Sequence, residues 1–305
     1  MSFAEPTGVD DVAEGLRAQG YFASEGLATA LFLSMSLQRP LFLEGEPGVG
    51  KTEVAKAVAA WTGASLIRLQ CYEGLDAAQA VYEWDYTRQL LHLRAAEATG
   101  RAAGVGESQL EDELYDERFL VKRPLLEAVS GTHEDPPVLL IDEVDRADDE
   151  FEAFLLEVLS DYAVTVPEIG RFRADVPPRV IITSNRTRDV HDALKRRCLY
   201  HWVDHPGFEQ EVAIIASRAP SVSDSLALQV AAAVEQLRDL GLYKPPGVAE
   251  SIDWAEALSR LGQTELTEHT VDATLGAVLK YREDQQRVTD QGIPELLARV
   301  MARAG

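Results

Sequence analysis

Gly45-Glu46-Pro47-Gly48-Val49-Gly50-Lys51-Thr52 decides the fold, because it is a complete phosphate-binding loop of the form G-x-x-x-x-G-K-[ST]. The apolar run 40–44 before it predicts a buried strand. The segment 51–62 after it carries apolar residues on one face and predicts a helix. A strand, a glycine-rich turn and a helix start together direct backbone N–H groups at a polyphosphate. We therefore predict that the chain binds a nucleoside triphosphate.

Each loop position has an expected task, and all eight residues are candidate nucleotide-binding residues. Gly48 and Gly50 let the backbone approach the phosphates without an intervening Cβ. The Lys51 ammonium is expected to reach the β- and γ-phosphates, and the Thr52 hydroxyl to take a position on a Mg²⁺ ion.

A second group of polar residues follows buried strands further along the chain. The run 137–143 is apolar on both faces, as in a central parallel strand, and ends in Asp142 and Glu143. Asp142 is the candidate Mg²⁺ residue, partly through water, and Glu143 the candidate to polarise the attacking water. Asn185, which ends the strand 179–185, is expected to orient the same water. An ordinary acidic strand end is the alternative for an isolated Asp-Glu pair.

Three further side chains are candidates to act on this group. Gln70, which ends a predicted strand at 65–70, is a candidate to restrain Glu143. Arg196 and Arg197 close a predicted helix at 192–197. We expect these arginines to lie too far from the γ-phosphate of their own loop, but to reach that of a neighbour in a ring. The alternative is a solvated basic helix terminus.

The remaining pattern predicts two domains. The first is expected to contain a strand at 199–203, a helix beginning at 149, a hairpin of 164–166 with 171–173, a second hairpin of 82–86 with 90–93, and a loop over 100–116. After residue 205 the pattern is helical only, which places the boundary near 205. Pro294 is expected to open the last helix.

Composition limits the possible partners and compartment. The chain has 305 residues with 29 basic against 51 acidic side chains, a net charge of −22. Such a chain repels a phosphate backbone, so we expect no nucleic-acid partner; basic partner surfaces suit it better, although solubility alone also explains the charge. Cys71 and Cys198 have no CxxC companion, which fits a reducing cytosol. We expect no signal peptide, no membrane insertion and a cytoplasmic location.

These motifs, in this order, resemble the MoxR family of AAA+ ATPases over nearly the whole chain. Three segments resemble its CoxD-type branch: Cys71 to Asp76, Tyr82 to Tyr86 and Lys244 to Glu250. The resemblance implies an α/β fold, a P-loop AAA+ three-layer core with a parallel sheet over residues 1–205, and a smaller all-helical lid domain over 206–305. It also implies a helix-2 insert at about 72–95 and a pre-sensor hairpin at about 163–176.

By the same resemblance the chain hydrolyses ATP with Mg²⁺ in a homo-oligomeric ring, expected to be a hexamer. Lys51 and Thr52 correspond to Walker A, Asp142 and Glu143 to Walker B. Asn185 corresponds to sensor 1 and Arg197, rather than Arg196, to the arginine finger. The implied partners are a client protein or metalloenzyme that the ATPase remodels or helps to mature, and a von Willebrand factor A-domain protein.

One position departs from the family, and other functions stay open. Asp253 stands where the family commonly has the sensor 2 arginine, and an aspartate cannot clamp a phosphate; Lys244 is a candidate substitute. The alternatives are an ATP-gated scaffold that does not hydrolyse, another P-loop enzyme such as a small-molecule kinase, and a DNA-handling motor, which the net charge disfavours. The GTPase base-reading motif and the ABC signature are absent from the sequence.

Overall fold

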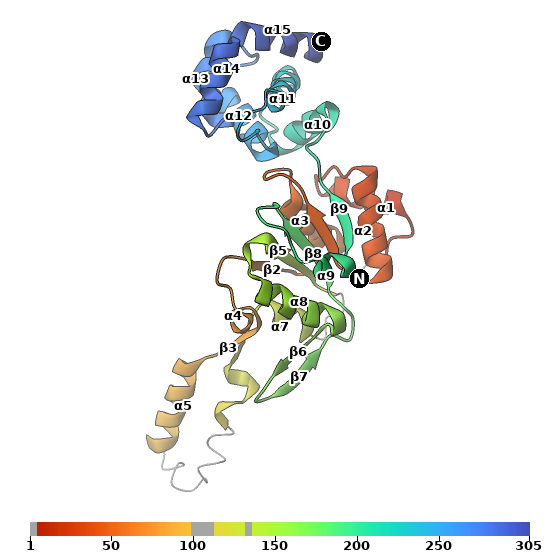
Figure 1. Ribbon diagram of the computed structural model, residues 1–305, viewed down its shortest axis with the longest axis vertical. Helices are drawn as coiled ribbons and strands as arrows, with labels where there is room; N and C mark the ends of the chain where they lie inside the picture. Colours follow the sequence, from red (N-terminus) through yellow and green to blue (C-terminus); the bar gives the residue numbers. More distant parts are fainter. Residues whose placement is uncertain (1–4, 99–112, 132–135) are drawn as a thin grey trace. The chain divides into compact units, whose positions relative to one another are not determined.

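A five-stranded sheet organises the first part of the chain (Figure 1). The computed structural model describes residues 5–98, 113–131 and 136–305. The strand order is β2-β5-β8-β1-β9, and β2, β5 and β8 pair in parallel. The strands are β1 (Leu41–Glu44), β2 (Leu66–Gln70), β5 (Val138–Asp142), β8 (Arg179–Ser184) and β9 (Leu199–Trp202). The predicted parallel α/β sheet is therefore confirmed.

Helices cover both faces of this sheet, since every residue of β5 is buried. Around it lie α2 (Glu25–Leu37), α3 (Lys51–Thr62), α7 (Pro124–Val129), α8 (Asp149–Asp161) and α9 (Asp192–Arg197). One apolar core joins β2, β5 and β8 to α7 and α8, with Leu126 and Leu155 fully buried in it. Side chains buried on both faces explain the continuous apolar runs in the sequence.

Two compact units interleave along the chain. The first comprises residues 30–43 and 58–201 together with the N-terminal residues, and it contains nearly all of the sheet. The second comprises residues 6–29, 44–57 and 202–305. The phosphate loop therefore belongs to the second unit, although β1 before it begins in the first.

The second unit is helical. It contains α1 (Val9–Ala18), α10 (Phe208–Arg218), α11 (Asp224–Arg238), α12 (Val248–Arg260), α13 (Glu268–Val278), α14 (Arg282–Gln291) and α15 (Ile293–Ala304). The fully buried Trp254 fills its core, and the indole Nε1 donates to Thr274 Oγ1 at 2.7 Å. Pro294 lies in the first turn of α15, as predicted. The helical pattern expected after residue 205 is confirmed.

One of the two expected hairpins forms and the other does not. β6 (Ala163–Val166) pairs antiparallel with β7 (Gly170–Arg173), as predicted. The pairing of 82–86 with 90–93 is wrong, because β3 (Tyr82–Trp84) pairs instead with β4 (Leu120–Lys122), and α5 (Tyr86–Ala98) is a helix.

Helix capping explains the second hairpin's absence. Asp85 Oδ1 accepts a hydrogen bond from Arg88 N at 3.0 Å, and the residues that follow are mostly good helix formers. The short α4 (Ala77–Val81) and η2 (Glu117–Phe119) complete this region. Most of the loop expected over 100–116 lies outside the described residues.

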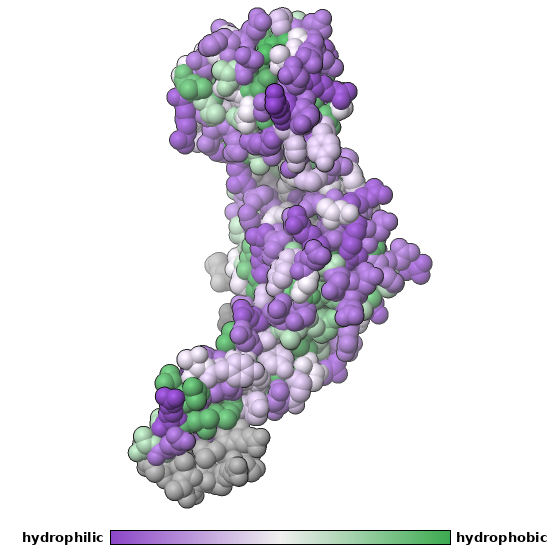
Figure 2. Space-filling model, turned by 60° about the vertical axis from the view of Figure 1, so that its left-hand side comes forward, coloured by the Kyte–Doolittle hydropathy of each residue, from purple (hydrophilic) through white to green (hydrophobic). Residues whose placement is uncertain are grey.

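The face drawn in Figure 2 is largely hydrophilic, with apolar side chains gathered over α5. Leu90 and Leu91 of that helix are 51% and 61% exposed. No helix within the described ranges is both long enough and apolar enough to cross a membrane.

Asp145 ties the end of β5 to the segment after β8. It lies in η3 (Val144–Arg146) and is 2% exposed. Its carboxylate accepts from Asn185 N at 3.1 Å, Thr187 N at 2.8 Å and Thr187 Oγ1 at 2.6 Å. Burial alone raises the pKa of Asp145, but these hydrogen bonds outweigh burial and hold the pKa below its ordinary value of 3.8.

In the second unit, Glu211 is a buried charge with matched partners. It is fully buried, and both carboxylate oxygens accept from Arg238, at 2.6 and 2.8 Å. Ser251 Oγ also donates to it, at 2.5 Å, and Arg238 Nε donates to Pro246 O at 2.8 Å. This network joins α10, α11 and α12 to the turn before α12.

We expect Asp145→Asn to lower the free energy of unfolding at neutral pH by about 1–3 kcal/mol, because an amide cannot accept all three hydrogen bonds. A lowered folded-state pKa contributes stability above the ordinary pKa, and that contribution is lost as pH falls through the folded pKa. The difference between wild type and variant should therefore shrink below about pH 4. Urea unfolding at several pH values measures it; a difference that stays constant down to about pH 2 would contradict the assignment.

Removing one partner of the buried pair should cost far more than removing an exposed one. We expect Glu211→Ala to destabilise by about 3–5 kcal/mol, because it leaves the Arg238 charge buried and unpaired. Adding Arg238→Met should recover part of that loss. Glu256→Ala, which breaks the exposed pair with Arg260, is the control and should cost under about 1 kcal/mol. Denaturant unfolding of the single and double variants tests this, and additive losses would show that the two side chains do not interact.

Candidate functional site

The phosphate loop has a backbone that excludes side chains at defined points. A Cβ on Gly45 would lie 2.3 Å from Val203 O, so no other residue fits there. Gly48 and Gly50 have φ values of +85° and +94°, which other residues rarely adopt. The loop leads directly into α3, which begins at Lys51, so the unsatisfied N–H groups of its first turn follow the glycines.

Lys51 is buried inside this loop. The residue is only 5% exposed, and its Nζ donates to Gly45 O and to Glu46 O, both at 2.8 Å. These carbonyls hold the ammonium within the turn, but they carry no full negative charge. The loop places this ammonium close to the backbone N–H groups at the start of α3, an arrangement that suits a bound anion.

The start of α12 packs directly on the loop. Val248 N donates to Gly48 O at 2.9 Å, and a Cβ on Gly247 would lie 2.8 Å from the Gly48 Cα. Glu250 Oε2 accepts from Gly247 N at 3.0 Å and so caps the helix. The loop and the first turn of α12 therefore form one packed structure within the second unit. Sequence reasoning missed Gly247, whose only signal was a glycine directly before a predicted helix.

Titratable groups of both signs lie near the loop: Lys51 and Arg238 are positive, and Asp204 and Glu250 are negative. Burial, together with the positive charge of Arg238, lowers the pKa of His205 to about 4, and the charge of Lys51 contributes in the same direction. The imidazole is therefore neutral at neutral pH. Its Nδ1 is buried without a hydrogen-bond partner among the described residues. Burial likewise raises the pKa of Tyr21, which packs near Gly50.

The residues of the loop fit the phosphates of a nucleoside triphosphate. Three observations support this: the glycine positions that bring the backbone close, the helix start at Lys51, and the buried ammonium. When bound, Mg²⁺ would neutralise charge on the phosphates, and Thr52 in the first turn of α3 is the loop's hydroxyl suited to it.

The carboxylate of Asp142 lies at the end of β5 in the first unit, and the residue is 2% exposed. Oδ1 accepts from Thr183 Oγ1 at 2.6 Å. Oδ2 accepts from Arg68 Nη2 at 2.6 Å and Nε at 3.1 Å. Burial, followed by the negative charge of Asp142, raises the pKa of Cys71 to about 12, so this thiol stays protonated and is a poor nucleophile.

Glu143 begins the turn after β5 in a left-handed conformation, with φ 56° and ψ 51°. Its N–H donates to Thr183 Oγ1 at 2.9 Å, so the Thr183 hydroxyl bridges Asp142 and Glu143. The side chain is partly exposed, and its two oxygens contact three residues. Asn185 Nδ2 donates to Oε1 and Gln70 Nε2 donates to Oε2, both at 3.2 Å, and Arg146 Nε forms an ion pair with Oε2 at 2.9 Å.

The structure thus brings Asp142, Glu143 and Asn185 together, with Gln70 bonded to Glu143 as the sequence suggested. Strand register explains this: Gln70 pairs with Asp142, and Ile141 with Ile182, so the carboxyl ends of β2, β5 and β8 meet. The eight loop residues are contiguous and belong to the other unit.

Arg196 and Arg197 both lie exposed at the end of α9 but differ in their partners. The Arg197 guanidinium donates to Leu156 O and Ser160 Oγ of α8. For Arg196, no side-chain hydrogen bond or ion pair occurs with any residue the structure describes. Arg39 donates to the main-chain carbonyls of both arginines and fixes the helix end.

Sequence reasoning missed three residues of the carboxylate cluster: Arg68, Thr183 and Asp145. Each carries a weak signal, a polar side chain within or directly after an apolar strand. Such a residue is usually a solvated face or a satisfied core group. Only the structure shows that Arg68 and Thr183 contact Asp142, and that Asp145 bonds the backbone of Asn185.

Comparison with solved structures finds similar chains at low identity. A mutant of Thermotoga maritima RuvB is 15% identical, covers 97% of this chain and 84% of its own, and has a TM-score of 0.49. The Thermotoga maritima RuvB Holliday junction branch migration motor is 15% identical, with 89% of this chain and 72% of that chain covered and a TM-score of 0.45. A putative ATPase from Cytophaga hutchinsonii is 14% identical, with 97% of this chain and 92% of that chain covered and a TM-score of 0.43. At these values the likenesses say nothing about substrate.

No curated protein matches the chain in sequence. A family model does: the AAA domain (dynein-related subfamily) matches residues 40–198, just over half of the 305 residues. That range begins with β1 and includes the phosphate loop, the carboxylate cluster and α9. Members of this class bind ATP with Mg²⁺, commonly assemble into rings, and have the P-loop fold with a parallel central sheet that is seen here. The chain belongs to the AAA domain family, dynein-related subfamily.

Proposed function

We propose that this chain is a Mg²⁺-dependent ATPase in which Gly45 to Thr52 bind the triphosphate. Asp142 and Thr52 hold the metal, and Glu143 activates the attacking water. The observation that carries the proposal is the hydrogen-bonded group at the end of β5: Thr183 fixes both acidic residues, and Asn185 bonds the Glu143 carboxylate. A carboxylate positioned by an amide and partly open to solvent suits a general base.

The carboxylates would act as a pair with divided roles. Asp142 is buried and its oxygens are engaged by Thr183 and Arg68, so its position is fixed. Contact with a metal through water requires no displacement of these partners. Glu143 is more exposed and is held at 3.2 Å by two amides and at 2.9 Å by Arg146, so it turns toward an attacking water only when these contacts break.

We further propose a MoxR-type, CoxD-like ring, expected to be a hexamer, that remodels a client protein or helps to mature a metalloenzyme in the cytoplasm, together with a von Willebrand factor A-domain protein. The sequence motifs support this assignment. In it, residues 1–205 form the core, 206–305 the lid, 72–95 the insert and 163–176 the pre-sensor hairpin. Arg197 would serve the neighbouring subunit; its bonds to α8 would have to break, whereas Arg196 needs no such release.

A second candidate, an ATP-gated scaffold that does not hydrolyse, is favoured by one observation. Asp253 lies exposed on α12, the helix whose start packs on Gly48. A carboxylate there repels phosphate rather than clamping it. If that prevents turnover, ATP would bind and hold an assembly together without being consumed.

Glu143→Gln separates these candidates. We expect turnover to fall by about 10²–10⁴-fold with ATP affinity nearly unchanged, because the amide retains the shape but cannot accept the proton. Glu150→Gln, on the exposed first turn of α8, is the matched control and should leave both quantities unaltered. Steady-state phosphate release and binding of a fluorescent ATP analogue measure them. Equal turnover by Glu143→Gln and wild type would remove Glu143 from the role, and absence of turnover in wild type would favour the scaffold.

Mixing two inactive variants tests the shared site. Lys51→Ala lacks the binding ammonium, and Arg197→Ala should lose about 10³–10⁵ in rate if the arginine acts across subunits. In a mixed ring some interfaces pair an intact loop with an intact arginine, so activity should reappear on mixing. The same mixture made with Arg196→Ala shows which arginine acts. Mixtures that remain as inactive as their components would mean that each site is complete within one chain.

A further inference from the structure

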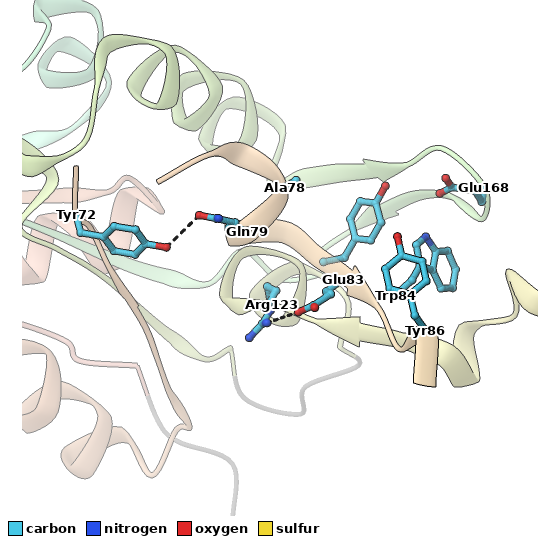
Figure 3. Close-up of a pocket in the computed structure, with 9 residues that line it drawn as sticks. Tyr72, Ala78, Gln79, Glu83, Trp84, Tyr86, Arg123 and Glu168 are labelled. Carbon is cyan, nitrogen blue, oxygen red and sulfur yellow. Dashed lines mark hydrogen bonds and ion pairs between the residues drawn. The ribbon is translucent and has the colours of Figure 1, made fainter. Parts of the chain in front are cut away.

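An aromatic hollow of about 730 Å³ lies on the first unit, and none of the residues assigned to ATP chemistry lines it (Figure 3). Its walls come from α4, β3, the first residue of α5 and the turn between β6 and β7. Four aromatic side chains line it: Tyr72, Tyr82, Trp84 and Tyr86. Tyr72 and Tyr86 are 48% and 70% exposed, so their rings remain available to another molecule.

Trp84 contributes a largely buried indole ring to the wall of the hollow. The residue is 6% exposed, yet the indole Nε1 has no hydrogen-bond partner in the described part of the chain. The indole packs edge-on against Tyr82, with ring centroids 6.2 Å apart, and against Tyr115 at 5.3 Å. These contacts fix the ring, while its Nε1 is buried and out of reach of a molecule in the hollow.

The charge of the hollow favours a cation. Glu83 is paired with Arg123, whereas Glu168, on the β6–β7 turn, makes no hydrogen bond or ion pair with the residues that the structure describes. The negative charge of Glu168 reaches the aromatic group: after burial, it is the next cause that raises the pKa of Tyr82. A free carboxylate beside aromatic faces attracts a guanidinium or an ammonium ion.

The exposed apolar surface continues beyond the hollow. Tyr86 opens α5, and Leu90, 51% exposed, lies four residues later on the same helical face. A small cation would cover only the hollow. A polypeptide that places one side chain in the hollow would also cover the neighbouring face of α5.

We propose that this hollow docks an arginine side chain of a partner polypeptide, with Tyr86 stacking on the guanidinium and Glu168 pairing with it. Arginine suits the site better than lysine because its planar group stacks on a ring while also bonding a carboxylate. The net charge of −22 complements a basic partner. This surface lies outside the proposed ATPase chemistry and does not depend on hydrolysis.

The test measures binding of a fluorescein-labelled, amidated peptide of repeated Gly-Ser-Arg units to the full chain by fluorescence anisotropy. We expect wild type to bind it and to ignore the same peptide with citrulline in place of arginine. Tyr86→Ala and Glu168→Gln should each weaken binding by about three- to tenfold. Tyr243→Ala and Glu265→Gln, which change an exposed tyrosine and an exposed glutamate of the second unit, are matched controls and should bind as wild type does.

All variants should retain wild-type affinity for a fluorescent ATP analogue, which separates this proposal from the proposed ATPase function. The docking site is overturned if wild type does not bind the arginine peptide or binds the citrulline peptide equally. It is also overturned if Tyr86→Ala and Glu168→Gln lose no more affinity than their controls.

Discussion

Hydrogen bonding between the parallel strands β2, β5 and β8 determines where the acidic residues of the first unit meet. The register pairs Gln70 with Asp142, so the amide, Thr183 of β8 and the carboxylates converge at one edge of the sheet. A shift of one residue in β5 would turn Asp142 to the other face and separate it from Thr183. The hydrogen bonds that Asp142 accepts from Thr183 and Arg68 favour that register, because a slip would break them.

In the second unit, close contact between backbone segments fixes the position of the phosphate loop. The carbonyl of Val203 leaves no space for a side chain at Gly45, and the backbones of Gly48 and Gly247 touch. The hydrogen bond from Val248 N to Gly48 O fixes the first turn of α12 against the loop. A displacement of the loop backbone would therefore disturb the start of α12. Glycine is needed here for contact between two main chains as well as for access to a phosphate.

Sequence alone predicted what depends on local pattern. The loop, the apolar β5 run and α3 each have a distinctive signal within a dozen residues, and all three form where predicted. The pairing of residues 82–86 failed because their true partner, β4, lies over thirty residues away, beyond any short-range signal. The contact between Arg68 and Asp142 could not be predicted for a related reason. This bond spans 74 positions and depends on strand order, which no local pattern specifies.

Glu143 holds a backbone conformation that its own side chain opposes. At φ 56° the Cβ crowds the neighbouring carbonyl, at a cost of about 1 kcal/mol that glycine would avoid. A chain selected only for thermal robustness would thus lose its acidic group at this point. The backbone is therefore slightly strained at the residue proposed to activate water. Replacing Glu143 with glycine would relieve the strain and stabilise the fold, but it would remove the carboxylate that the proposed activity needs.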